Sequence, residues 1–182
     1  MTVSGAWSAI TNALVLPRNT SSANKLKEID PSVFKNKNFK WLDPANGVGN
    51  FPLIVYGMLM KSLKASIPDD YERSQHILKD MLYMVELQED NYEISRKLFG
   101  KDANIFCGSV LTEDTKSFNP EITKKFKVDK YDIIIGNPPF QKENIFNNYK
   151  KKIRNGGKNK LYEKITYKCI EILNNNGYLI FI

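Results

Sequence analysis

The segment from Tyr131 to Ile135 most constrains how this 182-residue chain can fold. Its sequence, YDIII, is a short apolar run rich in β-branched residues, and Gly136 follows it directly. A run of this length and composition is typical of a strand that is buried on both faces. Such strands occur in parallel sheets with helices packed on either side, so we predict an α/β fold.

Four further strands are predicted, and helical patterns lie between them. The strands are Phe39–Asp43, Met81–Glu86, Asn104–Cys107 and Tyr178–Ile182. The helices are Ala23–Ile29, Leu53–Leu63, Gln75–Asp80, Gln88–Leu98 and Tyr162–Leu173, with a connection over Ile67–Ser74 and a turn over Asn174–Gly177. This alternation predicts one domain with a mostly parallel, doubly wound sheet.

The turn after Ile135 carries a candidate catalytic motif, Asn137-Pro138-Pro139-Phe140. Asn137 offers a side-chain carbonyl and Pro138 a main-chain carbonyl, and the two prolines stiffen the turn while removing competing N–H donors. An amine that donates both hydrogens to these acceptors has its lone pair directed at an electrophile. Phe140 can stack on a planar ring. The alternative is that these residues form only a proline-stiffened turn at the end of the strand, without a catalytic role.

A second candidate site follows the predicted strand Phe39–Asp43 and has the sequence DPANGVGNF. Its candidate ligand-binding residues are Asp43, Pro44, Ala45, Asn46, Gly47, Gly49, Asn50 and Phe51. The glycines allow a sharp turn and let a ligand approach the main chain. The loop lacks the Lys-Ser or Lys-Thr of a phosphate-binding loop, and an ordinary tight turn is the alternative. The next strand ends in Glu86, whose carboxylate can accept both hydroxyls of a ribose.

The chain has a formal net charge of +7, which makes nucleic acid the natural anionic partner. Its richness in Lys and Asn is also explained by the nucleotide composition of a gene. Cys107 and Cys169 lack metal-ligand spacing and are predicted to be reduced core thiols, and His76 is predicted to be a helix residue. We therefore predict no metal site. With neither a signal peptide nor an apolar run of spanning length, a soluble cytoplasmic protein without membrane contact is expected.

These motifs together resemble the adenine-N6 DNA methyltransferases of restriction-modification systems, which use S-adenosylmethionine. Residues 43–51 resemble the DPxxGxGxF cofactor loop of that family, Glu86 its ribose-binding acid, and residues 137–140 its NPPF or NPPY motif. The resemblance implies a Rossmann-like class I methyltransferase fold. It implies a catalytic core over residues 41–182, preceded by an N-terminal helical segment of the cofactor-binding domain over residues 1–40.

Four features depart from the family pattern. Asn46 and Val48 stand where members often carry Cys and Ser or Thr, and the glycines still set the geometry. Ser109 replaces an Asp that accepts the adenine amine of the cofactor, and a neutral acceptor is weaker than a charged one. A Thr-Pro motif near the N-terminus has only Leu16-Pro17 as a counterpart.

The resemblance also implies a mechanism and a partner. A target adenine in DNA would flip out of the duplex, be held by Asn137 and the Pro138 carbonyl, and stack on Phe140. A basic segment follows this turn and would contact phosphates, although a solvated loop explains it equally well. Its charged members are Lys142, Lys150, Lys151, Lys152, Arg154, Lys158 and Lys160.

Two further expectations concern the extent and the activity of the chain. The family fold continues past the fifth strand, so we expect this chain to be the amino-terminal portion of the catalytic domain, truncated after that strand. A missing C-terminal region or a partner subunit would supply the other strands and the target-recognition region. Alternative activities are methylation of RNA or of protein glutamine, because the NPPF turn suits planar amides and amines alike. A nonenzymatic nucleic-acid-binding remnant or subunit of the same fold is the alternative from another class.

Overall fold

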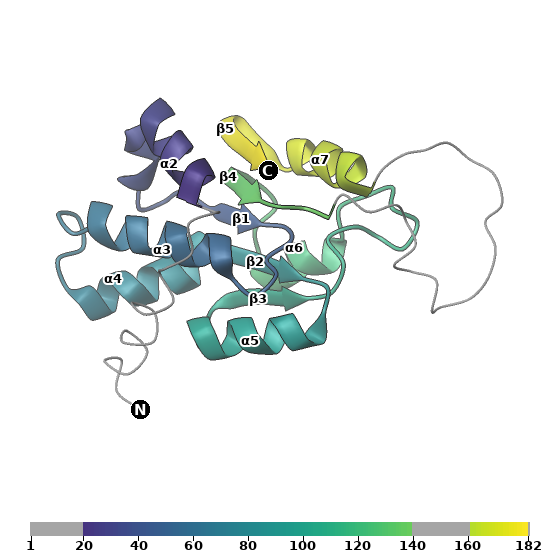
Figure 1. The fold of residues 1–182 in the computed structure, drawn as a ribbon, viewed down its shortest axis with the longest axis horizontal. Coiled ribbons are helices and arrows are strands. Elements are labelled where there is room, and N and C mark those ends of the chain that lie inside the picture. Colours follow the sequence, from purple (N-terminus) through teal and green to yellow (C-terminus); the bar gives the residue numbers. More distant parts are fainter. Residues whose placement is uncertain (1–19, 140–160, 182) are drawn as a thin grey trace.

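A computed structural model describes residues 20–139 and 161–181, and its centre is one five-stranded sheet (Figure 1). The strands are β1 Trp41–Asp43, β2 Leu82–Glu86, β3 Asn104–Cys107, β4 Tyr131–Gly136 and β5 Leu173–Phe181. They lie in the order β3-β2-β1-β4-β5, and every neighbouring pair is parallel. The predicted α/β fold with a parallel sheet is confirmed. All the described strands therefore end at the same edge of the sheet.

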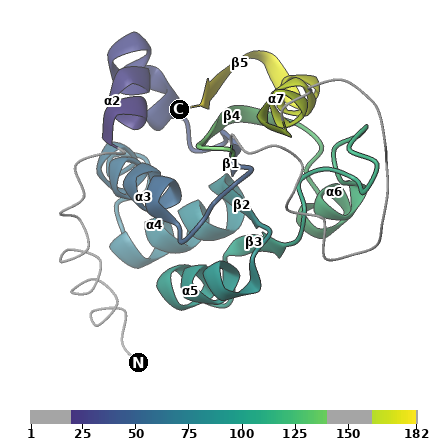
Figure 2. The ribbon, with the colours of Figure 1, turned by 45° about the vertical axis from the view of Figure 1, so that its right-hand side comes forward.

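Helices cover both faces of the sheet (Figure 2). They are α2 Thr20–Ile29, α3 Asn50–Ser62, α4 Asp70–His76, α5 Glu89–Phe99, α6 Pro120–Phe126 and α7 Leu161–Glu171, with a 3₁₀ turn η1 Pro31–Phe34 and a π-helical turn η2 Ile77–Met81. Figure 2 shows α2 to α5 on one side of the strands and α6 and α7 on the other. This three-layer arrangement buries the central strands β1, β2 and β4 from both sides, as their apolar composition requires.

Neighbouring residues of the central strands contribute to two different cores. Trp41 and Ile133 pack with residues of α2, η1 and α3, whereas Leu42 and Ile134 pack with residues of α6 and α7. Successive side chains of a strand point to opposite faces, so this division follows directly from the pleat. All four are almost completely buried. The β-branched run in the sequence reflects this two-sided burial.

The elements before β1 belong to the first of these cores. Ala23 and Leu26 of α2 and Phe34 of η1 are buried within it. Asp30, between the two elements, accepts a hydrogen bond from the Tyr178 hydroxyl of β5 at 3.1 Å. Residues 20–34 therefore pack on the sheet itself.

Two short helices differ from the sequence prediction. The predicted connection Ile67–Ser74 contains the start of α4, which begins at Asp70 after the Asp69 side chain accepts from the Glu72 N–H at 2.8 Å. No helix was predicted over Pro120–Phe126, where α6 follows Asn119 as its side-chain cap. Both helices have only seven residues, so neither shows enough turns for a clear apolar period.

The turn predicted over Asn174–Gly177 lies inside β5. Tyr131 of β4 pairs with Leu173, but Ile133 pairs with Tyr178, so β5 carries a bulge between these two points. Asn176 has a φ of 65°, and a Cβ on Gly177 would lie 2.6 Å from the Asp132 carbonyl oxygen. The turn residues therefore interrupt the register of the strand without ending it.

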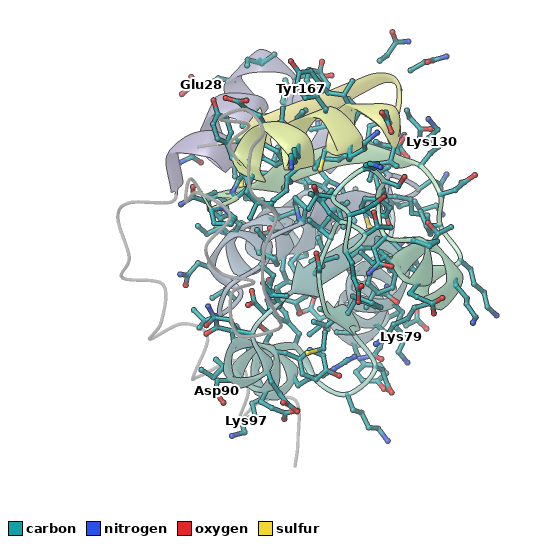
Figure 3. The ribbon with its side chains drawn as sticks, turned by 90° about the vertical axis from the view of Figure 1, so that its right-hand side faces the viewer. Glu28, Lys79, Asp90, Lys97, Lys130 and Tyr167 are labelled. Carbon is teal, nitrogen blue, oxygen red and sulfur yellow. The ribbon has the colours of Figure 1, made fainter. Side chains whose placement is uncertain are left out.

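The remaining predictions concern single residues and the surface. Cys169 is buried as predicted, but Cys107 is exposed because it ends β3, an edge strand of the described sheet. His76 lies in α4, where its ring nitrogens contact the Asp80 carboxylate and the Lys37 carbonyl. Figure 3 shows Lys79, Lys97 and other charged side chains extending from the surface of several elements. None of the described helices is both long and apolar enough to cross a membrane.

Candidate functional site

A cavity of about 230 Å³ lies where β1, β2, β3 and β4 end. Its described lining comes from the segments after these four strands and from α7. The lining residues are Pro44, Ala45, Gly47, Glu86, Leu87, Gln88, Asn91, Gly108, Ser109, Val110, Leu111, Thr115, Asn137, Pro139, Leu161 and Ile165. Glu86 is the single ionisable side chain among them. The cavity therefore suits a ligand that is held mainly by apolar contacts and neutral hydrogen-bonding groups.

The loop after β1 meets this cavity through its first half. Pro44, Ala45 and Gly47 line the cavity. Gly47 has a φ of 59°, and a Cβ placed on it would meet no atom within 4 Å. Its lack of a side chain therefore serves the left-handed backbone conformation and leaves space open beside the cavity.

Gly49 has a different role in the same loop. It precedes α3 with a φ of 94°, and a Cβ on it would lie 2.7 Å from a ring carbon of Phe99 in α5. Glycine is required there for close packing between the loop and α5. Asn50 begins α3, and Phe51 is buried in the core. Neither of these two predicted cofactor-binding residues lines the described cavity.

Asn46 anchors the loop instead of lining the cavity. Its side chain is 4% exposed, and its amide nitrogen donates to the Ser95 hydroxyl oxygen at 2.7 Å and to the Gly47 carbonyl oxygen at 3.1 Å. Ser95 lies on α5 and is fully buried. The loop is therefore tied to a helix almost fifty residues further along the chain.

Glu86 stands at the end of β2 with a carboxylate that several N–H groups already hold. Its Oε2 accepts from the Gly47 N–H at 2.6 Å, and its Oε1 accepts from the Gln88 N–H at 2.8 Å. The Asn91 amide contributes a longer contact of 3.4 Å to Oε1. A carboxylate has about four acceptor positions, so at least one remains for a ligand hydroxyl. Its orientation is fixed before any ligand binds.

Asp43 lies beneath the loop at 2% exposure and is absent from the described lining of the cavity. Burial raises the pKa of its carboxyl group to about 7, although the hydrogen bond from the Ala45 N–H opposes this and the Glu86 charge adds to it. Its Oδ2 has no hydrogen-bond partner among the described residues. A buried carboxylate without full hydrogen bonding favours its neutral form, which explains the direction of the shift.

The segment after β3 supplies a third part of the wall. Ser109 lines the cavity, and its hydroxyl oxygen accepts from the Leu111 N–H at 3.1 Å, which leaves its own hydrogen and a second acceptor position. Thr115 also lines the cavity, with a φ of 58° that is unusual for a β-branched residue. The Lys164 ammonium of α7 donates to its hydroxyl at 2.9 Å. This contact connects the loop after β3 with α7.

The predicted catalytic turn begins at the end of β4. Asn137 and Pro139 are exposed and line the cavity, whereas Pro138 is buried. Phe140 lies outside the described residues, as do Leu16-Pro17 and the basic segment that begins at Lys142. Gly136, the last residue of β4, is closely packed, because a Cβ there would lie 2.7 Å from Oδ1 of Asp43. The start of the loop after β1 and the start of the catalytic turn are therefore in direct contact.

Several lining residues had no sequence signal of their own. Leu87, Gln88 and Asn91 follow Glu86, and their proximity to it was the only available indication. Thr115, Leu161 and Ile165 reach the cavity through long-range packing that no short motif encodes. Within the described ranges, no group of three or more His, Cys, Asp or Glu side chains is arranged to hold a metal ion.

Taken together, the parallel five-stranded sheet and the helices on both of its faces are the fold of the class I methyltransferases. Solved structures share this fold. The chain is similar to a putative class I S-adenosylmethionine-dependent methyltransferase from Listeria monocytogenes, with 14% identity, a TM-score of 0.50, and coverage of 98% of this chain and 51% of that one. It is also similar to the modification subunit of a putative type I restriction enzyme from Vibrio vulnificus, with 16% identity, a TM-score of 0.52, and coverage of 86% and 30%.

Residues 62–182 match the Eco57I restriction-modification methylase family, and the chain belongs to that family. The matched range contains Glu86, Ser109 and the turn at residues 137–140, and it starts after the glycine loop. The predicted family resemblance is thereby confirmed. A curated relative, an uncharacterized adenine-specific methylase of Mycoplasma pneumoniae, is 26% identical, and the match covers 63% of this chain and 42% of that protein.

A third solved structure is similar in fold. It is the ATP-dependent type ISP restriction-modification enzyme LlaBIII bound to DNA, with 19% identity and a TM-score of 0.56. The match covers 89% of this chain and 14% of that enzyme. The chain thus spans less than half of its curated relative and about half or less of these structures.

Proposed function

We propose that this chain is the cofactor-binding and catalytic part of a DNA methyltransferase that transfers a methyl group from S-adenosylmethionine to the N6 amine of adenine. The single observation that carries the proposal is the shared cavity. It brings together Gly47, Glu86, Ser109 and Asn137 from the ends of four strands, as the resemblance to adenine methyltransferases requires. Membership of a restriction-modification methylase family supports the same substrate.

The residues present fit the proposed cofactor. Glu86 retains acceptor capacity for a ribose hydroxyl, and Gly47 presents no side chain that would occupy the space beside it. Ser109 retains a donor and an acceptor position for a polar base edge. The cavity volume of about 230 Å³ is below the roughly 300–1,000 Å³ of typical ligand sites, so it leaves no room for a target base beside the cofactor. When bound, S-adenosylmethionine supplies an electrophilic methyl group.

The catalytic turn would position the amine and would not remove a proton from it before transfer. Asn137 offers a side-chain carbonyl at the rim of the cavity, and the buried Pro138 offers a rigid main-chain carbonyl. The described lining contains no histidine, lysine or cysteine that could act as a conventional base. Rate acceleration would therefore come from orientation and from hydrogen bonds to the amine.

The target adenine would leave the base stack to reach this turn, because its amine is inaccessible within a duplex. Phe140 would stack on the flipped base, a role that rests on its position in the NPPF sequence. The basic segment after it would contact phosphates, which predicts salt-sensitive and sequence-independent binding. DNA is accordingly the proposed partner, and a further region of the protein would select the target sequence.

The test is labelled methyl transfer to duplex DNA, RNA and a glutamine-containing protein, with Asn137→Ala compared with Asn24→Ala. Asn24 is exposed on α2 and does not line the described cavity, so its variant is the matched control. We expect transfer to adenine in DNA, a loss of at least 100-fold in Asn137→Ala, and unchanged cofactor affinity in both variants. Full transfer by Asn137→Ala would contradict its role. Cofactor binding without transfer to any substrate would favour the nonenzymatic alternative.

A further inference from the structure

The backbone of Gly47 is held on both sides by buried side chains. Its N–H donates to Oε2 of Glu86 at 2.6 Å. Its carbonyl oxygen accepts from the Asn46 amide at 3.1 Å and from the Ser95 hydroxyl at 3.3 Å. Because Gly47 has no side chain and a φ of 59°, its own conformational preference does not hold it in this position. The surrounding hydrogen bonds do so.

Ser95 is the member of this group that lies farthest from the ligand. It is fully buried on α5 and is absent from the described lining of the cavity, so a ligand there does not reach it. Its hydroxyl accepts from Asn46 at 2.7 Å and donates to Gly47. A buried hydroxyl is costly unless it is hydrogen-bonded, and here both of its bonds go to the cofactor loop.

We propose that Ser95 is a positioning residue for ribose recognition, which rests on the proposed binding of a nucleoside cofactor. Ser95 and Asn46 fix the Gly47 backbone so that its N–H faces Glu86. The Gly47 and Gln88 N–H groups then hold one carboxylate oxygen each, which leaves acceptor capacity for a ligand hydroxyl beside the longer Asn91 contact. Loss of the Ser95 hydroxyl frees the loop, and the carboxylate loses a fixed partner.

This role predicts a selective effect on the sugar of the ligand. Glu86 is proposed to accept hydrogen bonds from ribose hydroxyls, so a displaced carboxylate weakens binding of a ribose ligand. A 2′-deoxyribose ligand lacks one of these hydroxyls, so displacement of the carboxylate weakens its binding less. A serine that only stabilised α5 would weaken both ligands equally, or neither. The ratio of the two dissociation constants therefore separates positioning from general stability.

The experiment is calorimetric titration of S-adenosylhomocysteine and its 2′-deoxyribose analogue into wild type, Ser95→Ala and Ser74→Ala. Ser74 is the matched control, because it is a buried serine that accepts from the Tyr56 hydroxyl at 2.8 Å and does not line the described cavity. In Ser95→Ala we expect about tenfold weaker binding of the ribose ligand, the size of one lost hydrogen bond, with the deoxyribose ligand much less affected. Ser74→Ala should leave the ratio at its wild-type value.

Asn46→Ala extends the test along the same connection. The variant should lower the ribose preference as Ser95→Ala does, and the double variant should lose little more, because both side chains act on the Gly47 carbonyl oxygen. If Ser95→Ala does not fold, Ser95→Cys keeps a small side chain with a weaker donor and should give an intermediate ratio. Thermal unfolding of each variant confirms that the titrated protein is folded.

Two outcomes would overturn the inference. An unchanged ratio of the two dissociation constants in folded Ser95→Ala would refute the positioning role, and the proposed cofactor site would remain. If Ser95→Ala does not fold, an unchanged ratio in Ser95→Cys would refute it in the same way. Failure of the wild type to bind either ligand would overturn the cofactor proposal and this inference with it. The same titrations distinguish the two failures, because only the second appears in the wild type.

Discussion

Asp43 and Gly136 illustrate how closely the ends of β1 and β4 are packed. Asp43 is buried at the start of the proposed cofactor loop, and Gly136 directly precedes the proposed catalytic turn. The two residues touch, since no Cβ fits between the Gly136 backbone and the carboxylate of Asp43. A change at either residue is therefore expected to affect both halves of the proposed site.

Asp43 should make the stability of the protein depend on pH. Folding raises the pKa of this carboxyl group from 3.8 to about 7, mainly through burial. Between these values the folded protein binds one proton more than the unfolded chain, so the contribution of Asp43 to the free energy of unfolding falls as the pH rises. Urea unfolding should show Asp43→Asn gaining stability relative to wild type from about pH 4 to pH 7. Parallel profiles for the two proteins would contradict this prediction.

Gly136→Ala should destabilise the protein by about 1–3 kcal/mol, because the new methyl group overlaps the buried carboxylate of Asp43. Gly57→Ala in α3 is the control, since a Cβ there meets no atom within 4 Å and alanine favours the helix. Denaturant unfolding measures both variants. Combining Gly136→Ala with Asp43→Ala should cost less than the sum of the single changes, and additive costs would show that the overlap is not the cause.

The loop after β3 and helix α7 form one wall of the cavity together. Thr115 is held in a left-handed backbone conformation that is unfavourable for its branched side chain. Lys164 of α7 donates to its hydroxyl, and Leu161 and Ile165 of the same helix line the cavity beside it. The position of this wall therefore depends on contacts between elements far apart in the sequence.

Lys164→Met should weaken cofactor binding several-fold by releasing Thr115 from α7. Methionine keeps the apolar stem, so the packing of α7 should change little. Lys168→Met is the control on the same helix, because Lys168 pairs with Glu171 and does not line the described cavity. Isothermal titration of the cofactor provides the measurement. Equal affinities in the two variants would argue against a role of the Lys164 contact.

The sequence predicted the elements with strong periodicity and the motifs that follow strands. Tyr131–Ile135 was placed within one residue, because burial on both faces leaves a clear apolar run, and Phe39–Asp43 was placed within two residues of β1. Helix α6 was missed, although Asn119-Pro120 is a typical helix start. The role of Ser95 in holding the loop could not be predicted, since one buried serine in a helix carries no pattern. Short motifs predict the site residues that are close together in the sequence. Residues that join the site through long-range packing cannot be predicted in this way.

At the scale of the whole molecule, the proposed cofactor should stabilise the fold, because it contacts the ends of four strands. A ligand that binds only the folded state adds about 2.7 kcal/mol at a concentration of 100 times its dissociation constant. For a domain of this size, that gain raises the melting temperature by several degrees. The magnitude is large enough for a thermal shift assay to detect.

Gly47→Val should abolish that thermal shift, because a branched side chain is strained at a φ of 59° and would occupy the space beside the cavity. Gly100→Val is a closely matched control. Gly100 also has a positive φ and no atom within 4 Å of an added Cβ, but it ends α5 away from the described lining. Both variants should lose stability, and only Gly100→Val should keep the shift. A retained shift in Gly47→Val would exclude the loop from the ligand site.

The wide spacing of the lining residues also bears on synthesis of the protein by the ribosome. The described lining runs from Pro44 to Ile165, and α7 supplies part of its wall. A nascent chain that has been synthesised only as far as β2 would present the Glu86 carboxylate without Asn137 or the part of the wall that α7 supplies. We infer that ligand affinity develops only once α7 has been synthesised and packs on the sheet, so a nascent chain that has not reached α7 does not sequester the proposed methyl donor.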